Sequence, residues 1–259
     1  MGCRPAQPTV SLPGNERRDD PVLHRMNLTF ASYNIHKGVG LDRRRDPERI
    51  MAVLHEIDAD VIALQEADRR FGERHAVLTH QLLEDHGRYR AVQLATGRHS
   101  IGWHGNALLV RREFTIAEAG IVPLPTLEPR GAIRADLLVE GQRVRVVGMH
   151  LDLSGLRRRQ QVRAVLAHCA RCDHPSPTVL MGDFNEWSQH GGSFGEFQSG
   201  WRVLAPGRSF PSRRPVAQLD RVVVSDEWHC ERAGVHHSLL AAAASDHLPV
   251  WAKLELPKK

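Results

Sequence analysis

The sequence predicts an α/β fold in which β-sheets stack on one another and helices lie outside them. Short apolar runs of about four to eight residues recur along the chain, and each ends in a polar residue, which is typical of strands buried on both faces. Helical patterns separate the first of these runs, whereas strand patterns dominate later in the chain. No linker with a change of composition interrupts residues 28–256, so we expect one domain.

Apolar runs between turn residues are the predicted strands. In chain order they are Leu28–Tyr33, Val61–Leu64, Asn106–Val110, Ala132–Val139, Val144–Met149, Thr178–Met181, the run from Leu219 through Val222–Val224, and Pro249–Leu256. Most are rich in Val, Ile and Leu, the composition expected of strands in the interior of a sheet.

Segments with helical periodicity lie between the strands. Asp46 is a good N-cap and proline suits the first helical position, so a helix is expected over Pro47–Ile57. Thr79–Asp85 is a second candidate and Ser154–Ala170 a third. In the third helix we expect one face to point inward, formed by Val162, Val165, Leu166 and Cys169, and the arginines to face solvent, namely Arg157, Arg158, Arg159 and Arg163.

Composition and charge narrow the class of protein. The chain has 259 residues and a net charge of +5, and lysine occurs at only four positions, so arginine supplies most of the positive charge. Arginine suits phosphate and carboxylate ligands, although a codon bias toward arginine explains the excess equally well. No apolar run is long enough to cross a membrane, and the polar N-terminal segment lacks the apolar core of a signal peptide. We expect a flexible tail over residues 1–27, a domain over 28–257, and a monomeric, cytoplasmic protein.

Four cysteines are present, and two of them form a CxxC pair. Cys169 and Cys172 are flanked by His168 and His174, which is compatible with a zinc knuckle or a redox pair. No second CxxC or spaced histidine pair accompanies them, and positions i and i+3 share one face of a helix. We therefore favour two small buried thiols, reduced in the cytoplasm.

Polar residues that end or follow the predicted strands form the candidate site. They are Asn34, Glu66, His150, Asp183, Asn185, Asp220, Asp246 and His247. Any one of them could be a turn residue or a surface histidine, but the pattern repeats over six segments. Loops at strand ends are where a rigid sheet places catalytic groups.

The chemistry of this set is that of metal-assisted hydrolysis of a phosphate ester. The carboxylate and amide oxygens are hard ligands of the kind that Mg²⁺ prefers, with Mn²⁺ as an alternative metal. The two histidines are donors for a phosphate oxygen, and a neighbouring aspartate can orient a histidine or hold it protonated. No cysteine belongs to the set, which disfavours soft-ligand metals.

The sequence resembles the endonuclease/exonuclease/phosphatase superfamily, whose fold is that of deoxyribonuclease I. The resemblance lies in motifs that follow the family's order: SYNIHKG (32–38), ALQEAD (63–68), HGNALLVRR (104–112), GMHLDL (148–153), MGDFNEW (181–187), QLDRVVVS (218–225) and SDHLPV (245–250). Together they span nearly all of residues 28–256. The resemblance implies a four-layer α/β sandwich of two packed mixed β-sheets flanked by helices.

The resemblance also implies roles for the site residues. The metal ligands are Asn34, Glu66 and Asp246, with Glu66 the principal one; the catalytic residues are His150, Asp183, Asn185, Asp220 and His247; and Asn106 and Arg130 bind substrate. In this scheme Asp183 orients or deprotonates the attacking water, and Asp220 orients His247 toward the phosphate. His150 donates to a non-bridging oxygen or assists the leaving group, and Asn185 hydrogen-bonds the scissile phosphate.

The expected function is that of a Mg²⁺-dependent phosphoric ester hydrolase, and most specifically a phosphodiesterase. The motifs most resemble those of small bacterial hydrolases that are grouped with lipid-remodelling proteins of the GPI-anchor type. Two substrate classes stay open, nucleic acid and a phospholipid headgroup, the latter with a peripheral membrane contact. Aromatic residues are only 5% and do not interleave with the basic clusters, which does not favour nucleic acid. A catalytically inactive binding protein of the same fold is the alternative of a different class.

Overall fold

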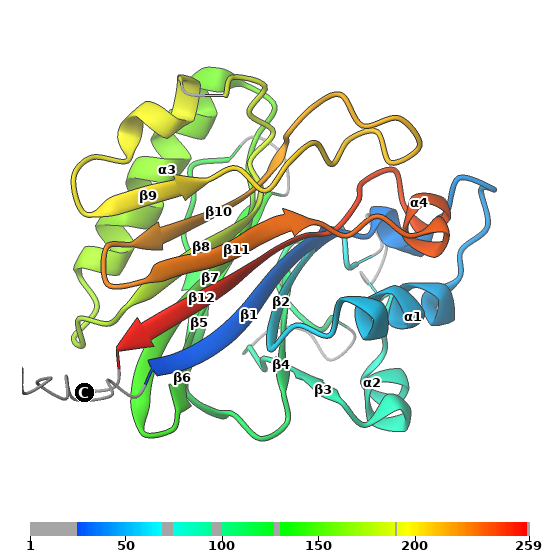
Figure 1. Cartoon of the computed structure of the whole chain (residues 1–259), viewed down its shortest axis with the longest axis horizontal. Helices are drawn as coiled ribbons and strands as arrows, with labels where there is room; N and C mark the ends of the chain where they lie inside the picture. Colours follow the sequence, from blue (N-terminus) through cyan, green and yellow to red (C-terminus); the bar gives the residue numbers. More distant parts are fainter. Residues whose placement is uncertain (1–24, 69–74, 95–99, 127–129, 190, 258–259) are drawn as a thin grey trace, which may run out of the picture.

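Two mixed six-stranded sheets form the centre of the protein, as a computed structural model shows for residues 25–68, 75–94, 100–126, 130–189 and 191–257 (Figure 1). The first sheet has the order β11-β12-β1-β2-β4-β3, with bounds β1 Arg25–Asn34, β2 Val61–Gln65, β3 Tyr89–Ala91, β4 Ala107–Arg111, β11 His229–Val235 and β12 Val250–Pro257. The second has the order β5-β6-β7-β8-β10-β9, with bounds β5 Thr115–Val122, β6 Gly131–Val139, β7 Gln142–His150, β8 Thr178–Asp183, β9 Trp201–Leu204 and β10 Asp220–Ser225.

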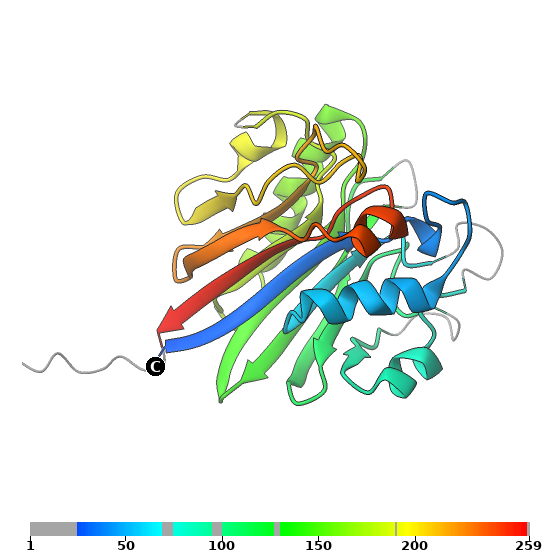
Figure 2. The ribbon, with the colours of Figure 1, turned by 45° about the vertical axis from the view of Figure 1, so that its right-hand side comes forward.

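Helices cover the outer face of each sheet. Helices α1 (Pro47–Ile57), α2 (His80–His86) and α4 (Leu239–Ala244) lie beside the first sheet, and α3 (Gly155–Ala170) lies beside the second (Figures 1 and 2). Two short 3₁₀ helices, η1 (His36–Gly38) and η2 (Gly192–Glu196), occur in loops. The predicted four-layer α/β sandwich is therefore confirmed.

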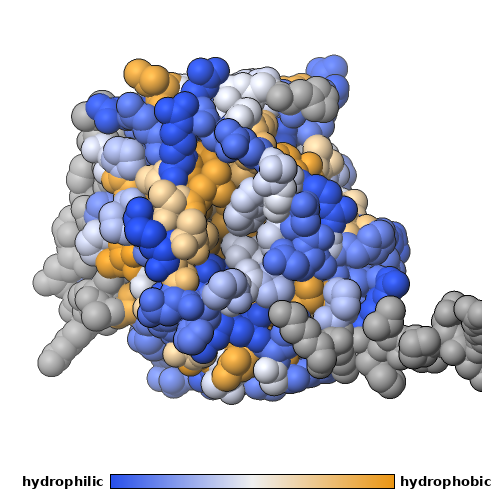
Figure 3. Space-filling view, turned by 90° about the vertical axis from the view of Figure 1, so that its left-hand side faces the viewer, coloured by the Kyte–Doolittle hydropathy of each residue, from blue (hydrophilic) through white to orange (hydrophobic). Residues whose placement is uncertain are grey.

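Three apolar clusters hold the layers together. The largest lies between the sheets and includes Phe30, Leu108 and Val146. A second packs α1, α2 and α4 on the first sheet, and a third packs α3 and η2 on the second. The space-filling view in Figure 3 shows a mainly hydrophilic face with separate hydrophobic patches. Most large apolar side chains are thus interior, where their burial stabilises the fold.

The predicted elements agree with the structure except at a few positions. α1 has the predicted bounds, with Asp46 accepting the capping hydrogen bond from the Arg49 amide, and Thr79 and Ser154 are N-caps rather than helical residues. β1 begins at Arg25, so residues 25–27 of the expected tail belong to a strand; residues 1–24 lie outside the described residues. No helix in the described ranges is long and apolar enough to cross a membrane.

The expected exposure of Arg158 is wrong. This side chain is buried, and its Nε and Nη2 each lie 3.3 Å from Glu186 Oε2. Arg158 precedes Val162 by four residues, so it lies on the inward face of α3. A buried arginine needs a charged partner, and the loop after β8 supplies one that no pattern along α3 could indicate.

Candidate active site

Strand register brings the polar strand ends of the two sheets to one edge. In the first sheet β1 and β2 run parallel, and Asn34 pairs with Gln65. In the second, His150 at the end of parallel β7 pairs with Asp183 at the end of β8, and Asp220 at the start of β10 lies opposite Asp183. Asn34 Nδ2 donates to Asp183 Oδ2 at 3.1 Å and joins the two sheets at this edge.

Asp183 is at the centre of the site and is nearly fully buried. Its Oδ2 lies 3.4 Å from His150 Nε2 and 3.9 Å from His247 Nε2, and its Oδ1 accepts the Asn185 amide at 2.9 Å. Burial raises the pKa of Asp183 to about 6; the charge of His247 opposes this shift, and that of Asp220 adds to it. The carboxylate is therefore a stronger base than an exposed aspartate and is still ionised near neutral pH.

His247 is held by a second buried carboxylate. Its Nδ1 lies 2.9 Å from Asp220 Oδ2, which also accepts the Ser209 hydroxyl at 2.5 Å, and the Phe210 ring packs beside the imidazole. Burial alone lowers the pKa of His247, but the negative charges of Asp220, Asp183 and Asp246 outweigh it and raise the pKa to about 10. The imidazole is thus a cation at neutral pH, with Nε2 directed to the Asp183 side.

Three expected metal ligands supply oxygen atoms beside this centre. Glu66 follows β2 in a left-handed conformation (φ 53°), and its carboxylate forms an ion pair with Lys37. Asn34 Oδ1 accepts the His36 amide at 3.1 Å. Asp246 Oδ1 lies 3.9 Å from His36 Nδ1, and the Asp246 side chain is about one-third exposed.

The donor types on this side fit a hard divalent cation. The Glu66 and Asp246 carboxylates are partly exposed, as suits a site that binds metal, water and substrate together. Asn106 Oδ1 is buried without a hydrogen-bond partner among the described residues, and its neighbour Gly105 accepts the Ala67 amide beside Glu66. An orphaned oxygen of this kind is a natural partner for a cation or a bound water.

Asp183, Asp220 and His247 form a second group with metal-ligating atom types, but their hydrogen bonds are those of residues that transfer protons. Atoms of Asp183, Asp220 and His247 lie within 4.8 Å of one another. His247 Nδ1 and Ser209 Oγ hydrogen-bond to Asp220 Oδ2, whereas Asp220 Oδ1 is buried without a hydrogen-bond partner among the described residues. The arrangement resembles an acid–histidine pair that orients and charges the imidazole.

The remaining predicted residues surround the same edge. Arg130 lies just before β6 and contacts His150 Nε2 through its guanidinium. Asn185, also in a left-handed conformation (φ 49°), donates from Nδ2 to the Leu151 carbonyl at 2.9 Å. Asn106 donates to the carbonyl oxygens of Trp103 and His104 at 3.3 and 3.4 Å. Arg130 is thereby held beside His150, and Asn185 beside Asp183.

Three contacts that the sequence did not reveal complete the site. Lys37 and Ser245 lie inside the recognised motifs, but no pattern along the chain marks them as site residues. Ser245 Oγ donates to the Asn34 carbonyl at 2.7 Å and accepts the His247 amide at 3.2 Å, so it joins β1 to the histidine loop. Ser209 lies in the β9–β10 loop, where no spacing or motif marks it.

Comparison with known proteins identifies the family. Residues 31–247 match the Endonuclease/Exonuclease/phosphatase family. The chain belongs to this family. Its members are hydrolases that act on phosphoesters, and they are generally dependent on a divalent metal.

Individual relatives extend over nearly the whole chain. YbhP of Escherichia coli (strain K12), described as uncharacterized, is 26% identical in an alignment of 254 residues that covers 90% of this chain and 98% of YbhP. The structure is similar to humanized D. rerio TDP2, with a TM-score of 0.71 and 17% identity over 88% of this chain and 98% of TDP2. A mannosyl-6-phosphatase of Bacteroides thetaiotaomicron has a TM-score of 0.68 and 21% identity over 88% of this chain and 99% of its own. At these identities the two structures establish the fold alone.

Proposed function

We propose that the protein is a Mg²⁺-dependent phosphodiesterase that hydrolyses its substrate by in-line attack of water, with Mn²⁺ as the alternative metal. The observation that carries the proposal is the placement of Asp183. This buried carboxylate lies within 4 Å of polar atoms of Asn34, His150 and His247, so a base and donors for a phosphate surround one point.

Each residue has a role that its contacts support. Asp183 accepts a proton from the attacking water. His247 donates from Nε2 to a non-bridging phosphate oxygen, while Asp220 and Ser209 fix its ring through Nδ1. His150 and Arg130 lie in contact, and this pair supplies a donor for a second phosphate oxygen or for the leaving group.

The amides and the metal ligands complete the scheme. Asn185 is a donor to the phosphate from the loop after β8, and Asn106, whose Oδ1 is unpaired among the described residues, contacts substrate or its bound water from the position before β4. Glu66, Asn34 and Asp246 would hold the metal, which supplies positive charge that stabilises the developing charge on the phosphate.

The test uses bis(p-nitrophenyl) phosphate, a diester that needs no specific leaving-group recognition. We expect Mg²⁺-dependent turnover that EDTA abolishes and that Asp183→Ala and His247→Ala each lower by about 100-fold or more. The matched controls are Asp173→Ala and His174→Ala, at exposed positions in the turn before β8, and these should keep full activity. Absence of metal-dependent turnover in the wild type, with no difference between it and the two site variants, favours the inactive binding protein.

Nucleic acid and phospholipid are the two substrate classes to be separated. Plasmid DNA and phospholipid vesicles are offered to the same protein under one set of conditions. Nicking that disappears in Glu66→Ala identifies a nuclease, whereas headgroup release without nicking identifies a lipid phosphodiesterase. The apolar and basic composition of the active-site edge, described below, favours the lipid.

A further inference from the structure

The large apolar side chains that are exposed on the described surface gather at one edge of the sheets. They are Leu41, Leu153, Leu156, Trp187, Val216 and Leu239. Every one lies in a segment at the active-site edge: after β1, after β7, after β8, before β10 or after β11. The turns at the opposite edge contribute none to this set. Scattered apolar residues need no explanation, but their restriction to the edge that holds the active site does.

Charge follows the same division. At the active-site edge the exposed acidic residues Asp42 and Glu48 are outnumbered by exposed arginines from the loop after β1, the first turns of α3 and the β9–β10 loop. These arginines are Arg43, Arg44, Arg45, Arg159, Arg208, Arg213 and Arg214. In the turns at the opposite edge, exposed acidic residues outnumber the three exposed arginines. The acidic residues are Asp58, Glu113, Glu140, Asp173, Asp226 and Glu227. The protein is therefore positively charged where its apolar side chains are exposed.

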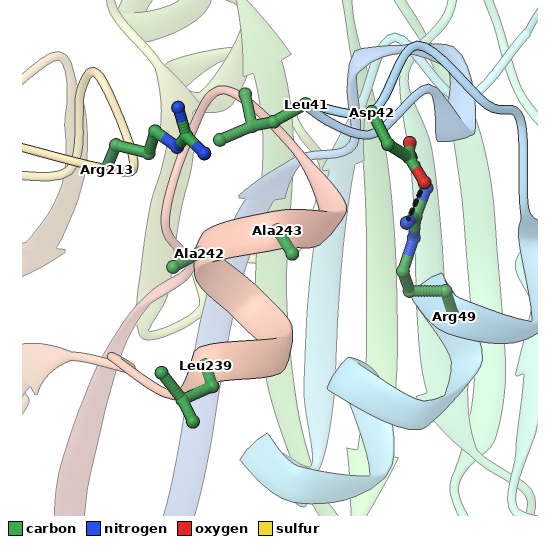
Figure 4. A pocket seen from close by; sticks show the side chains of 7 residues that line it. All are labelled: Leu41, Asp42, Arg49, Arg213, Leu239, Ala242 and Ala243. Carbon is green, nitrogen blue, oxygen red and sulfur yellow. Dashed lines mark hydrogen bonds and ion pairs between the residues drawn. The ribbon is translucent and has the colours of Figure 1, made fainter.

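A pocket at this edge combines both features. Its volume is about 380 Å³, and it lies between the loop after β1 and α4 (Figure 4). Leu41, Leu239 and two alanines of α4 form apolar walls, and Arg213 extends over one side. The one carboxylate in the lining, Asp42, is paired with Arg49 at 3.0 Å, so Arg213 supplies the net charge. Apolar walls beside a cation suit an amphiphile that carries a negative headgroup.

We propose that this edge docks on a bilayer that contains anionic phospholipid. The six apolar residues and seven arginines named above are together called the rim. Aliphatic and tryptophan side chains that enter the headgroup region, together with arginines that face anionic lipid, are the usual components of peripheral membrane binding. Five of the six apolar side chains are aliphatic and cannot stack on bases, so a single-stranded nucleic acid fits the rim less well.

Docking would place the active site against the membrane surface. The loops that carry Leu153, Trp187 and Val216 directly follow or precede His150, Asp183 and Asp220 in the chain. A headgroup phosphate at the bilayer surface would then face Asp183 and His247. Docking itself does not require catalysis, whereas the inference that the substrate is a phospholipid rests on the proposed phosphodiesterase.

Vesicle flotation of the full-length protein tests docking without relying on activity. The protein is mixed with vesicles of phosphatidylcholine alone or with added phosphatidylglycerol, at low and high salt. We expect flotation with the anionic vesicles that high salt weakens. Arg213→Ser with Arg214→Ser should lower the apparent affinity about 20-fold, and Leu153→Ser with Leu156→Ser about tenfold or more. The matched control is Arg171→Ser at the opposite edge, which should float like the wild type.

The outcomes separate docking from catalysis. No flotation with either vesicle, or equal flotation of the rim variants and wild type, overturns docking, as does tighter binding of the rim to single-stranded DNA than to anionic vesicles. His247→Ala should float normally, because it leaves the rim intact. If the wild type floats normally but releases no headgroup, the docking proposal is supported and the proposal that phospholipid is the substrate is contradicted.

Discussion

Asp183 and Asp220 lie directly opposite each other on antiparallel β8 and β10, and both are buried. Like charges so placed repel, and burial adds to the cost of ionising them. His247 bridges them, with Nδ1 2.9 Å from Asp220 and Nε2 3.9 Å from Asp183. The three residues are therefore one electrostatic unit, in which the imidazolium offsets the two carboxylates and the carboxylates keep the imidazole charged.

This unit predicts a bell-shaped pH dependence of kcat/KM. Activity should rise as Asp183 loses its proton, with a midpoint near its pKa of about 6, because only the carboxylate can accept a proton from water. It should fall near pH 10, where His247 with a pKa of about 10 loses the proton that it donates. Initial rates with the chromogenic diester at constant metal occupancy give both limbs. A profile that is flat between pH 5 and pH 8 contradicts the role of Asp183.

Asp220→Asn should shift the alkaline limb most, and it should also move the acid limb, because the Asp220 charge contributes to the raised pKa of Asp183 as well. The amide removes the negative charge that raises the pKa of His247, so this pKa falls and the decline in activity moves toward neutral pH. NMR titration of the His247 ring follows the same change without relying on turnover. Ser209→Ala is the matched control: it removes a hydrogen bond from Asp220 but no charge, so the limb should move far less. An unchanged His247 titration in Asp220→Asn contradicts this coupling.

Patterns that depend on neighbouring residues explain why so much of the fold was predictable. The proline after the Asp46 cap fixed the start of α1, and buried runs such as Val144–Met149 located central strands, because local propensity and burial agree there. Strand-end polar residues indicated Asn34, His150 and Asp183 for the same reason. Strand register aligns His150 with Asp183 at one edge of the second sheet, and the packing of the two sheets places Asn34 beside them.

Interactions between segments that are distant in the sequence could not be predicted from local sequence patterns. The Arg158–Glu186 pair joins α3 to the loop after β8, and the Ser209–Asp220 bond joins the β9–β10 loop to the first residue of β10. Neither has a spacing that a sequence displays, because the partners meet only after the sheets have packed. The Lys37–Glu66 pair is similar: both residues lie in recognised motifs, but their contact depends on two left-handed residues, His36 and Lys37.

Arg158→Met should destabilise the protein by about 3 kcal/mol, because it leaves Glu186 buried with its charge less well balanced. Glu186 also accepts the Ser193 amide and hydroxyl, so η2 should loosen with it. Urea unfolding measures the change. Arg159→Met, one residue along the same helix but exposed, is the control and should change the free energy of unfolding by less than about 0.5 kcal/mol. Equal stability of the two variants contradicts the importance of the buried pair.

Lys37→Met should tighten metal binding about fivefold. Lys37 and a metal compete for the Glu66 carboxylate, and both side chains are about one-quarter exposed, where an ion pair contributes about 1 kcal/mol. Calorimetric titration with Mn²⁺ measures the affinity directly. Lys253→Met, which removes a lysine paired with Glu231 on the first sheet, is the control. Weaker Mn²⁺ binding by Lys37→Met would instead show that the lysine positions Glu66 for the metal.

Asp183→Asn should inactivate the protein and yet stabilise it at alkaline pH. The pKa of this acid is higher in the folded protein, about 6, than its ordinary 3.8, so folding opposes its ionisation. The resulting loss of stability is absent below pH 3.8, grows as the pH rises, and is complete above pH 6. Asparagine avoids this penalty but has one acceptor oxygen where aspartate has two, so it loses the bond from either Asn34 or Asn185. We therefore expect a net gain of about 1–2 kcal/mol at pH 8 and none at pH 4. Urea unfolding at both pH values measures it, with Asp173→Asn as control; a gain that is equal at pH 4 and pH 8 would show that burial of the Asp183 charge is not its source.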